Sequence, residues 1–269
     1  VVQHNLSAIN TNRQMGVVTD ALQKSTEKLS SGYKINRAAD DAAGLSISEK
    51  MRSQIRGLNK ASDNAQDGIS LIQVAEGALN ETHSILQRMN ELATQAANDT
   101  NTSVDRQSIK DEIEQLNAEL DRISTTTQFN KQDLLTGKFS GKLQVGALEG
   151  QTMDLKISTA VSSTGLKVKD IKVSTNENAG KAMKSIQDAI ESVSKQRSKL
   201  GAIQNRLEHT INNLDTNAEN TQAAESRIRD TDMADEMVQY SKNNILSQAG
   251  QSMLAQANQQ TQGVLSLLG

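Results

Sequence analysis

A seven-residue repeat of apolar positions runs through residues 51–93 of this chain. The repeat is formed by Met51, Leu58, Ala65, Ile72, Leu79, Leu86 and Ala93. Apolar residues that recur about every 3.5 residues keep one side of a helix facing a partner, which is the coiled-coil signature. The 269 residues include no proline that would interrupt such a helix. At about 1.5 Å per residue, a helix from Leu45 to Asn98 would be about 80 Å long, which is typical of a structural rod.

A second apolar stripe lies beside the first, at Leu71, Ala75, Ala78, Ile85, Met89, Leu92 and Ala96. Two adjoining stripes predict that the helix is buried against more than one neighbour, as in a bundle. Helical spacing also predicts helices over residues 1–31, from 103 to about 127, and from about 179 onward, followed by a last helix through residues 237–268. The fold class is therefore mainly α, a long antiparallel bundle with paired N- and C-terminal helices.

Local signals mark where two of these helices begin and end. Gly32 follows the first helix at the position where a left-handed residue usually ends a helix. Thr102 and Asp105 have capping-box spacing at the start of a helix that folds back on the long one.

The period changes between about residues 129 and 175. Apolar residues alternate at 143–145, at 153–157 and again from 166 to 173, and Gly146 and Gly150 bracket a turn. Alternation with glycine turns predicts a small β-hairpin region within the helical fold.

Composition excludes several classes of function. Aromatic residues make up 1% of the chain, so its core must consist of aliphatic side chains. The net charge is -3, with 29 basic and 32 acidic residues intermixed, which argues against nucleic acid or an anionic membrane as a partner. No apolar run approaches the roughly 20 residues that span a bilayer. Cysteine is absent, so disulfides and thiolate chemistry are excluded.

Catalytic motifs are lacking. The three histidines, His4, His83 and His209, have no potential metal ligand three or four residues away, and neither HExxH nor a phosphate-binding loop occurs. The acidic pair Asp40-Asp41 fits the start of a helix better than paired catalytic carboxylates. We expect no enzyme activity, no catalytic residue, no metal and no cofactor. The charged stretch 227–236 (RIRDTDMADE) fits a recognition surface or a helix connector equally well.

The two terminal helices lack a second apolar stripe on which the bundle could dock. Isolated helices are marginally stable in water. We therefore expect these ends to need one another or neighbouring molecules, and the apolar C-terminal residues VLSLLG to be buried in an assembly.

Four segments carry a family likeness. Residues 29–36 (LSSGYKIN) and 39–45 (ADDAAGL) closely resemble the N-terminal signature of bacterial flagellin. Residues 200–208 (LGAIQNRLE) resemble its C-terminal bundle signature, and residues 224–232 (AESRIRDTD) resemble the junction into its terminal helix. The likeness spans essentially the whole chain, which looks like a short, two-domain flagellin.

The resemblance implies a structural subunit that polymerises with itself into the bacterial flagellar filament for swimming motility. Residues 1–43 and 228–269 would form the inner-tube domain D0, and residues 44–227 the bundle domain D1, with its β-hairpin region at about 129–175. Inner-tube contacts are expected at Met253, Leu254, Val264, Leu265 and Leu268.

The resemblance also implies partners and a location. The chain would be secreted to the extracellular filament by the flagellar type III export apparatus, with an export chaperone, and would meet the filament cap and junction proteins; neither nucleic acid nor a membrane is expected as a partner. The vertebrate Toll-like flagellin receptor would recognise D1 through positions matching Arg88, Leu92 and Glu112. The principal alternative is a hook–filament junction protein, and more distant ones are an enzyme within a flagellin scaffold and a cytosolic coiled-coil scaffold.

Overall fold

The computed structural model describes residues 5–266, and side chains are described for residues 5–259. These residues form a mainly helical chain with two small hairpins, as expected from the sequence. The helices are α1 (Leu6–Ser31), α2 (Ala42–Ala96), α3 (Ser103–Thr126), α4 (Asn176–Arg229) and α5 (Met233–Ser266). The strands are β1 (Gln128–Phe129), β2 (Gln132–Asp133), β3 (Phe139–Gln144) and β4 (Thr152–Ile157).

The chain divides into two compact units, and the divisions fall within α2 and α4. Unit 1 consists of Val1–Ile55 and Glu219–Gly269, and unit 2 consists of Arg56–Ala218. The two units are described separately below.

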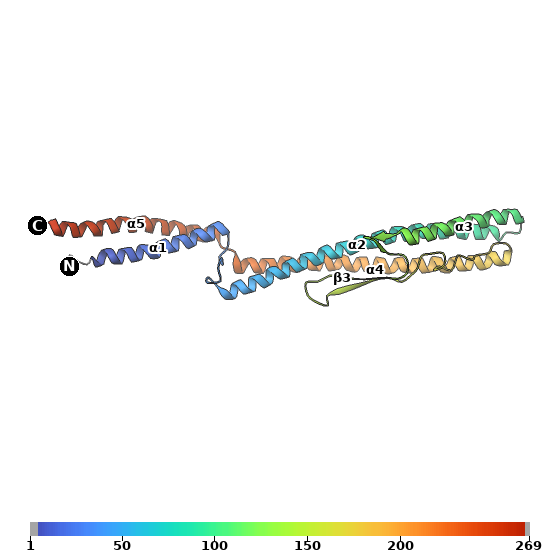
Figure 1. The fold of residues 1–269 in the computed structure, drawn as a ribbon, viewed down its shortest axis with the longest axis horizontal. Coiled ribbons are helices and arrows are strands. Elements are labelled where there is room, and N and C mark those ends of the chain that lie inside the picture. The colour runs from blue at the N-terminus through green and yellow to red at the C-terminus, as the bar shows by residue number, and fades with distance from the viewer. Residues whose placement is uncertain (1–4, 267–269) are drawn as a thin grey trace. The chain divides into compact units, whose positions relative to one another are not determined.

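Unit 2 is an antiparallel helical bundle (Figure 1). The end of α2 lies beside the start of α4, where the Thr94 hydroxyl lies 3.3 Å from the Met183 sulfur. Nearer the other end of the bundle, the Ser62 hydroxyl of α2 donates to Asp215 of α4 at 2.9 Å. The third helix, α3, runs back along α2. The expected antiparallel bundle is thereby confirmed.

The seven-residue repeat forms the core of this bundle. From Leu58 to Ala93, every member of the series is at most 7% exposed, whereas Met51, which belongs to unit 1, is half-buried. The second stripe is buried as well, with Ala78 and Ile85 only partly covered. Because both stripes are sheltered, α2 is buried against more than one neighbour, as the sequence predicts.

Two hairpins follow α3. Strands β1 and β2 pair through a tight turn in which Asn130 and Lys131 both have positive φ, 48° and 63°, as a type I′ turn requires. Strands β3 and β4 pair antiparallel, with Leu143 opposite Met153. The longer hairpin lies against α2 at two glycines, because a Cβ on Gly68 would lie 2.5 Å from the Leu143 side chain and one on Gly57 would lie 2.8 Å from the Ala147 side chain.

The third alternating segment, residues 166–173, is not a strand, so the prediction of a hairpin there is wrong. Leu166, Val168 and Val173 are buried in the bundle core. The backbone forms local bonds instead of a ladder, since the Val168 N–H donates to the Ser163 carbonyl at 2.9 Å. The Val168 carbonyl accepts a bond from the buried Asn117 amide at 3.1 Å. Alternating burial here comes from packing on helices rather than from strand pairing.

Unit 1 contains α1 and α5, which lie antiparallel side by side (Figure 1). The Asn5 amide near the start of α1 donates to the Ala257 carbonyl at 2.9 Å, and Lys28 near its end pairs with Glu236 at 3.3 Å. The terminal helices thus pack on one another, which confirms the predicted pairing of the N- and C-terminal helices.

A connector joins these helices to the rest of unit 1. The Lys34 N–H donates to the Arg229 carbonyl at 2.6 Å, and the Thr231 N–H donates to the Gly32 carbonyl at 3.0 Å. The Arg229 guanidinium lies 4.6 Å from the centre of the Tyr33 ring, a cation–π contact. Asp232 then caps α5 by accepting the Ala234 N–H at 2.9 Å. Residues 227–236 therefore serve as the helix connector, one of the two alternatives left open by the sequence.

Helix ends follow the local signals. Gly32 ends α1 with φ at 75°, and Thr102 with Asp105 forms the predicted capping box of α3. Asp41 accepts the Gly44 N–H at 2.9 Å at the start of α2, which agrees with its interpretation as a helix-start acid.

The core predicts the effect of truncating a repeat position. Leu79→Ala should lower the free energy of unfolding of unit 2 by about 2–5 kcal/mol, because it removes a fully buried side chain and leaves a cavity. Val74→Ala, on the same helix but 42% exposed, should change it by less than about 0.5 kcal/mol. Urea denaturation followed by circular dichroism measures the free energy of unfolding of both variants. Equal losses of this free energy would contradict a core formed by the seven-residue repeat.

The capping box predicts a pH dependence. The pKa of the Asp105 carboxyl is lowered, first because it accepts a bond from the Thr102 hydroxyl and then because it accepts one from the Thr102 N–H. A lowered folded pKa means that the ionised carboxylate stabilises the fold above its unfolded pKa, and that this stabilisation is lost as pH falls through the folded pKa. Thr102→Val should raise the Asp105 pKa, measured by carbon-detected NMR titration; an unchanged pKa would show that the hydroxyl bond does not lower it.

Candidate functional site

The most unusual surface of unit 1 consists of exposed apolar side chains on both of its paired helices. On α1 they are Leu6, Ile9 and Val17, each at least 60% exposed. On α5 they are Met233, Met237, Val238, Ile245, Leu246 and Met253, with exposures from 44% to 66%. Leu6 and Ile9 belong to the helical apolar spacing of residues 1–31, yet both are exposed.

The face of α5 that is covered by α1 explains this exposure. The less exposed positions of α5 are three or four residues apart, and Tyr240 and Leu254 are the only large apolar side chains among those named here. These positions are Glu236, Tyr240, Asn243, Ser247, Gly250, Leu254 and Ala257. Most of the large aliphatic and thioether side chains of α5 therefore lie outside the face that covers its partner. Apolar residues on every side of a helix indicate burial on more than one side, and α1 supplies only one.

The predicted inner-tube residues divide between these faces. Met253 is 62% exposed, whereas Leu254 is half-buried on the face toward α1. Val264 and Leu265 lie in the helical backbone of α5, but their side chains fall outside the described residues, as does the whole of Leu268. Val238 and Leu246 are exposed apolar residues that were not predicted from the sequence. Their signal was the presence of apolar residues all round α5, which a search for one stripe does not detect.

The predicted receptor residues lie in unit 2. The Arg88 guanidinium of α2 donates to Glu112 of α3 at 2.9 Å and lies 3.3 Å from Glu91. Its pKa is raised, first by the hydrogen bond to Glu112 and then by that to Glu91. Arg88 and Glu112 therefore form one exposed charged cluster that joins two helices.

Leu92 lies beneath this surface rather than on it. Its side chain is 2% exposed and belongs to the bundle core. One turn of helix separates it from Arg88. Beside them, Asn90, Glu91, Thr94, Gln95, Asn98 and Asn101 line an open polar groove of about 620 Å³.

A chemical centre is not apparent in the described part of the chain. Within residues 5–259, no three His, Asp or Glu side chains gather in a way that could hold a metal ion. His83 lies 3.0 Å from Gln87, and His4 is outside the described residues. Among the described helices, none is both long enough and apolar enough to cross a membrane.

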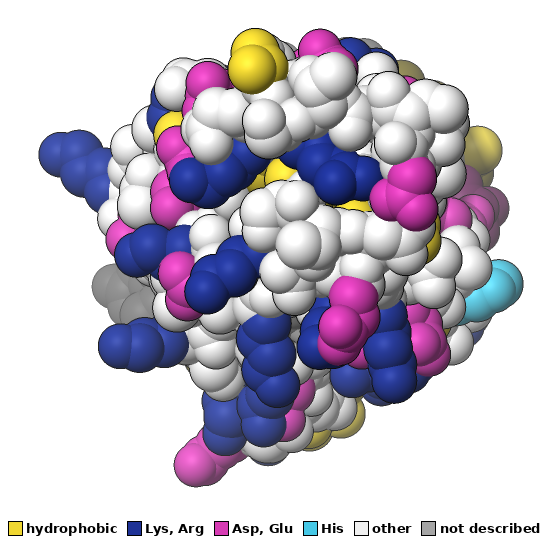
Figure 2. Space-filling model, turned by 90° about the vertical axis from the view of Figure 1, so that its right-hand side faces the viewer, with side chains coloured by type: hydrophobic (Ala, Val, Ile, Leu, Met, Phe, Trp, Pro, Cys, Tyr) yellow, Lys and Arg dark blue, Asp and Glu magenta, His cyan; other side chains and the backbone are white. Residues whose placement is uncertain are grey.

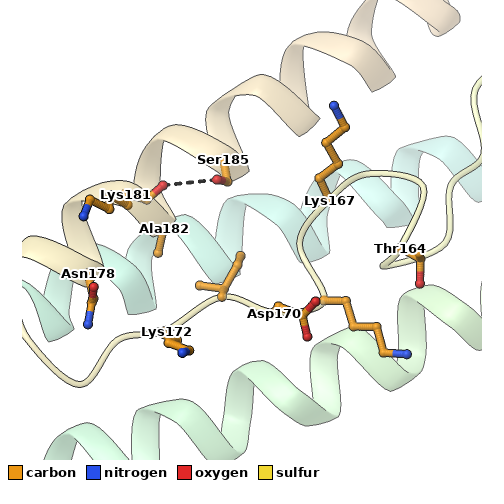
Figure 3. A pocket seen from close by; sticks show the side chains of 10 residues that line it. Thr164, Lys167, Asp170, Lys172, Asn178, Lys181, Ala182 and Ser185 are labelled. Carbon is orange, nitrogen blue, oxygen red and sulfur yellow. Dashed lines mark hydrogen bonds between the residues drawn. The ribbon is translucent and has the colours of Figure 1, made fainter.

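The other notable surface of unit 2 is rich in charged side chains of both signs. Figure 2, which looks onto the end that carries the α2–α3 turn, shows Lys and Arg side chains gathered there with acidic ones between them. A pocket of about 410 Å³ lies between the start of α4 and the loop that precedes it (Figure 3). Lys167, Lys169, Lys172 and Lys181 line it, with Asp170 as its acidic residue. These lysines were not predicted as a site, because the alternating apolar residues beside them predict a strand.

Comparison with known proteins supports the resemblance at both ends of the chain. Residues 2–140 match the family described as the bacterial flagellin N-terminal helical region, and residues 183–268 match the bacterial flagellin C-terminal helical region. A flagellin of Halalkalibacterium halodurans is 57% identical over 272 residues, covering 100% of this chain and 99% of the relative. The flagellar filament 31.3 kDa core protein of Treponema maltophilum is 50% identical over 285 residues, with coverage of 100% and 99%.

A solved structure agrees with these matches. The crystal structure of Bacillus cereus flagellin aligns with a TM-score of 0.51 and 32% identity, and the alignment covers 61% of this chain and 94% of that one. Family matches at both ends, and relatives aligned along the whole length, show that this chain belongs to the bacterial flagellin family.

Proposed function

We propose that this chain is the structural, non-enzymatic subunit of a bacterial flagellar filament, which it builds by polymerising with itself for swimming motility. A relative at 50% identity is named a filament core protein. A structural subunit of this kind performs no chemical reaction, so its function depends on the surfaces through which copies bind one another. Contacts between unlike surfaces on successive copies produce an open helical polymer.

The uncovered apolar faces of α1 and α5 carry this proposal. Val238 and Ile245 are each 66% exposed, and they are seven residues apart on one side of α5. Burying a side chain of this kind stabilises an assembly by about 1.5–3 kcal/mol. Neighbouring copies that covered these faces would supply the shelter that α1 alone does not give.

The domain assignment follows from the same reasoning. Residues 1–43 and 228–269 would form the inner-tube domain, with Met253, Leu254, Val264, Leu265 and Leu268 at its contacts. Residues 44–227 would form the outer bundle with its hairpins. The compact units divide at residues 55–56 and 218–219, so the proposed boundaries at 43–44 and 227–228 lie 12 and 9 residues nearer the termini.

Export partners complete the proposal. Apolar faces that remain open in a monomer would need masking before assembly, which suits an export chaperone. The same chain would pass through the type III export apparatus to the cell exterior and meet the filament cap and junction proteins. A hook–filament junction role is not favoured, because both curated relatives described above are named as a flagellin or a filament protein.

Charging the uncovered face tests polymerisation. Val238→Asp with Ile245→Asp should abolish filaments under conditions in which the unaltered chain forms them, because two carboxylates would be desolvated at the contact. Electron microscopy and sedimentation of salt-induced assemblies measure the outcome.

The control is Leu148→Asp, which places a carboxylate at an exposed apolar residue (66%) of the β3–β4 turn in unit 2. This variant should still polymerise, and circular dichroism should report folded monomers for both proteins. Normal filaments from the doubly substituted chain would contradict the proposed assembly surface.

We further propose that the vertebrate Toll-like flagellin receptor recognises the exposed cluster of Arg88 and Glu112. Arginine is enriched among the residues that dominate binding energy at interfaces. Here the guanidinium is held in place by two carboxylates, so little side-chain freedom would be lost on binding. Leu92 would contribute by fixing the helix beneath the cluster.

Substituting the arginine tests the recognition proposal. Arg88→Ala should raise the concentration for half-maximal receptor activation at least about tenfold, as expected for loss of a central arginine. The matched control is Arg122→Ala, because Arg122 donates to Glu119 at 2.8 Å in a similarly exposed pair farther along α3. Receptor-reporter cells and surface plasmon resonance measure both variants. Equal responses to the two would exclude Arg88 as a recognition residue.

A further inference from the structure

We propose that unit 2 carries a binding trough for an anionic polysaccharide, formed by the loop before α4 and the first turns of α3 and α4. This trough is distinct from the charged cluster of Arg88 and from the apolar faces of unit 1. Its binding does not depend on polymerisation.

The loop is built to present lysines. Its apolar residues, Leu166, Val168 and Val173, are at most 5% exposed and hold it on the bundle. Lys167, Lys169 and Lys172 lie between them and are exposed. The buried anchors hold this loop of successive turns on the bundle, so the three lysines project from an ordered segment rather than from a free tail.

Three pockets adjoin one another along this loop, and together they are called the trough. The pocket in Figure 3 shares Lys172 with a second one of about 390 Å³, which is also lined by Arg106 and Lys110 of α3. It shares Lys167 and Ser185 with a third of about 270 Å³ that extends along α4 to Asp188. Basic side chains spread over three adjoining pockets suit a linear chain better than a small ion.

The residues that line the trough carry a net positive charge. Its lining includes Arg106, Lys110, Lys167, Lys169, Lys172 and Lys181, against the acidic residues Asp170 and Asp188. The whole chain, by contrast, has a net charge of -3. Arg106, Lys110 and Lys181 have carboxylate partners, but within residues 5–259 the ammonium groups of Lys167, Lys169 and Lys172 form no ion pair. These three are available to an anion without first breaking an ion pair.

The lining chemistry favours a polysaccharide over a nucleic acid. Single-stranded nucleic acids are usually held by bases stacked on aromatic side chains, and no aromatic residue lines any of the three pockets. The three cations of the trough that form no ion pair within residues 5–259 are lysines, which attract an anion as point charges and do not require the bidentate geometry that the planar guanidinium of arginine recognises. Asn178, Ser185, Thr164 and Ser174 add amide and hydroxyl groups that can bond sugar hydroxyls.

Binding of fluorescein-labelled dextran sulfate to the full-length monomer tests the proposal by fluorescence anisotropy. The combined substitutions Lys167→Gln, Lys169→Gln and Lys172→Gln should weaken binding at least about tenfold and reduce the slope of log K against log salt by about two to three, since three counterion-releasing contacts are lost. Asp170→Asn should tighten binding, and a gain of affinity cannot come from misfolding.

The matched control combines Lys131→Gln, Lys138→Gln and Lys142→Gln, three exposed lysines of the hairpin region in the same unit. It changes the net charge equally and should leave affinity within about twofold, as expected for residues that make no direct contact with the anion. Equal losses in the two triple variants would overturn the proposal, because binding would then depend on net charge alone. Equally tight binding of uncharged dextran, or of a single-stranded oligothymidine, would overturn it as well.

Discussion

The structure depends on keeping long aliphatic seams away from water without the help of large aromatic rings. In unit 2, α2 carries two such stripes, and α3, α4 and the β3–β4 hairpin cover them. Leu79 and Leu86 are completely buried there. In unit 1, α5 carries a comparable number of large apolar residues but has only α1 beside it. The need to bury apolar side chains is therefore met differently in the two units. Unit 2 buries its stripes within its own bundle, whereas the helix pair of unit 1 leaves apolar surface exposed.

An aliphatic core of nearly uniform side chains offers little to fix the register of one helix against another, and buried polar groups supply that information. Ser62 is 7% exposed and donates to Asp215 across the bundle. Gln196 of α4 is 2% exposed and accepts a hydrogen bond from the Thr159 hydroxyl at 3.3 Å, which places the loop after β4 on this helix. A slip of α2 along α4 would leave the buried Ser62 hydroxyl without its partner, and a shift of the loop would do the same to the Gln196 side-chain carbonyl, at a cost of about 1–3 kcal/mol for each group. The β3–β4 hairpin is positioned by steric fit, because it approaches α2 closely at Gly57 and Gly68, where a side chain would clash with it.

Much of this fold could be predicted from sequence because its signals are local and periodic. The repeat from Leu58 to Ala93, the stop at Gly32 and the cap at Thr102 each require only a few residues of context. Residues 166–173 could not be assigned correctly, since strands and loops laid on helices both bury alternate side chains. Met253 was predicted as an assembly contact, but Val238 and Leu246 on the exposed part of α5 were missed, because apolar residues on all sides of a helix give no period. Which side faces α1 is decided by packing rather than by pattern.

Arg88 and Leu92 connect the core to the surface. Residues four apart on a helix lie on nearly the same side, yet Arg88 is exposed and Leu92 is 2% exposed. Burial of Leu92 sets the rotation of α2, and that rotation decides that the guanidinium of Arg88 meets Glu112 on α3. A partner that bound this cluster would therefore respond to the packing of the bundle as well as to its charge. Recognition of the Arg88–Glu112 cluster would therefore depend on the aliphatic core that holds the bundle together. A substitution that changed the packing of this core would also change the position of the charged cluster on the surface.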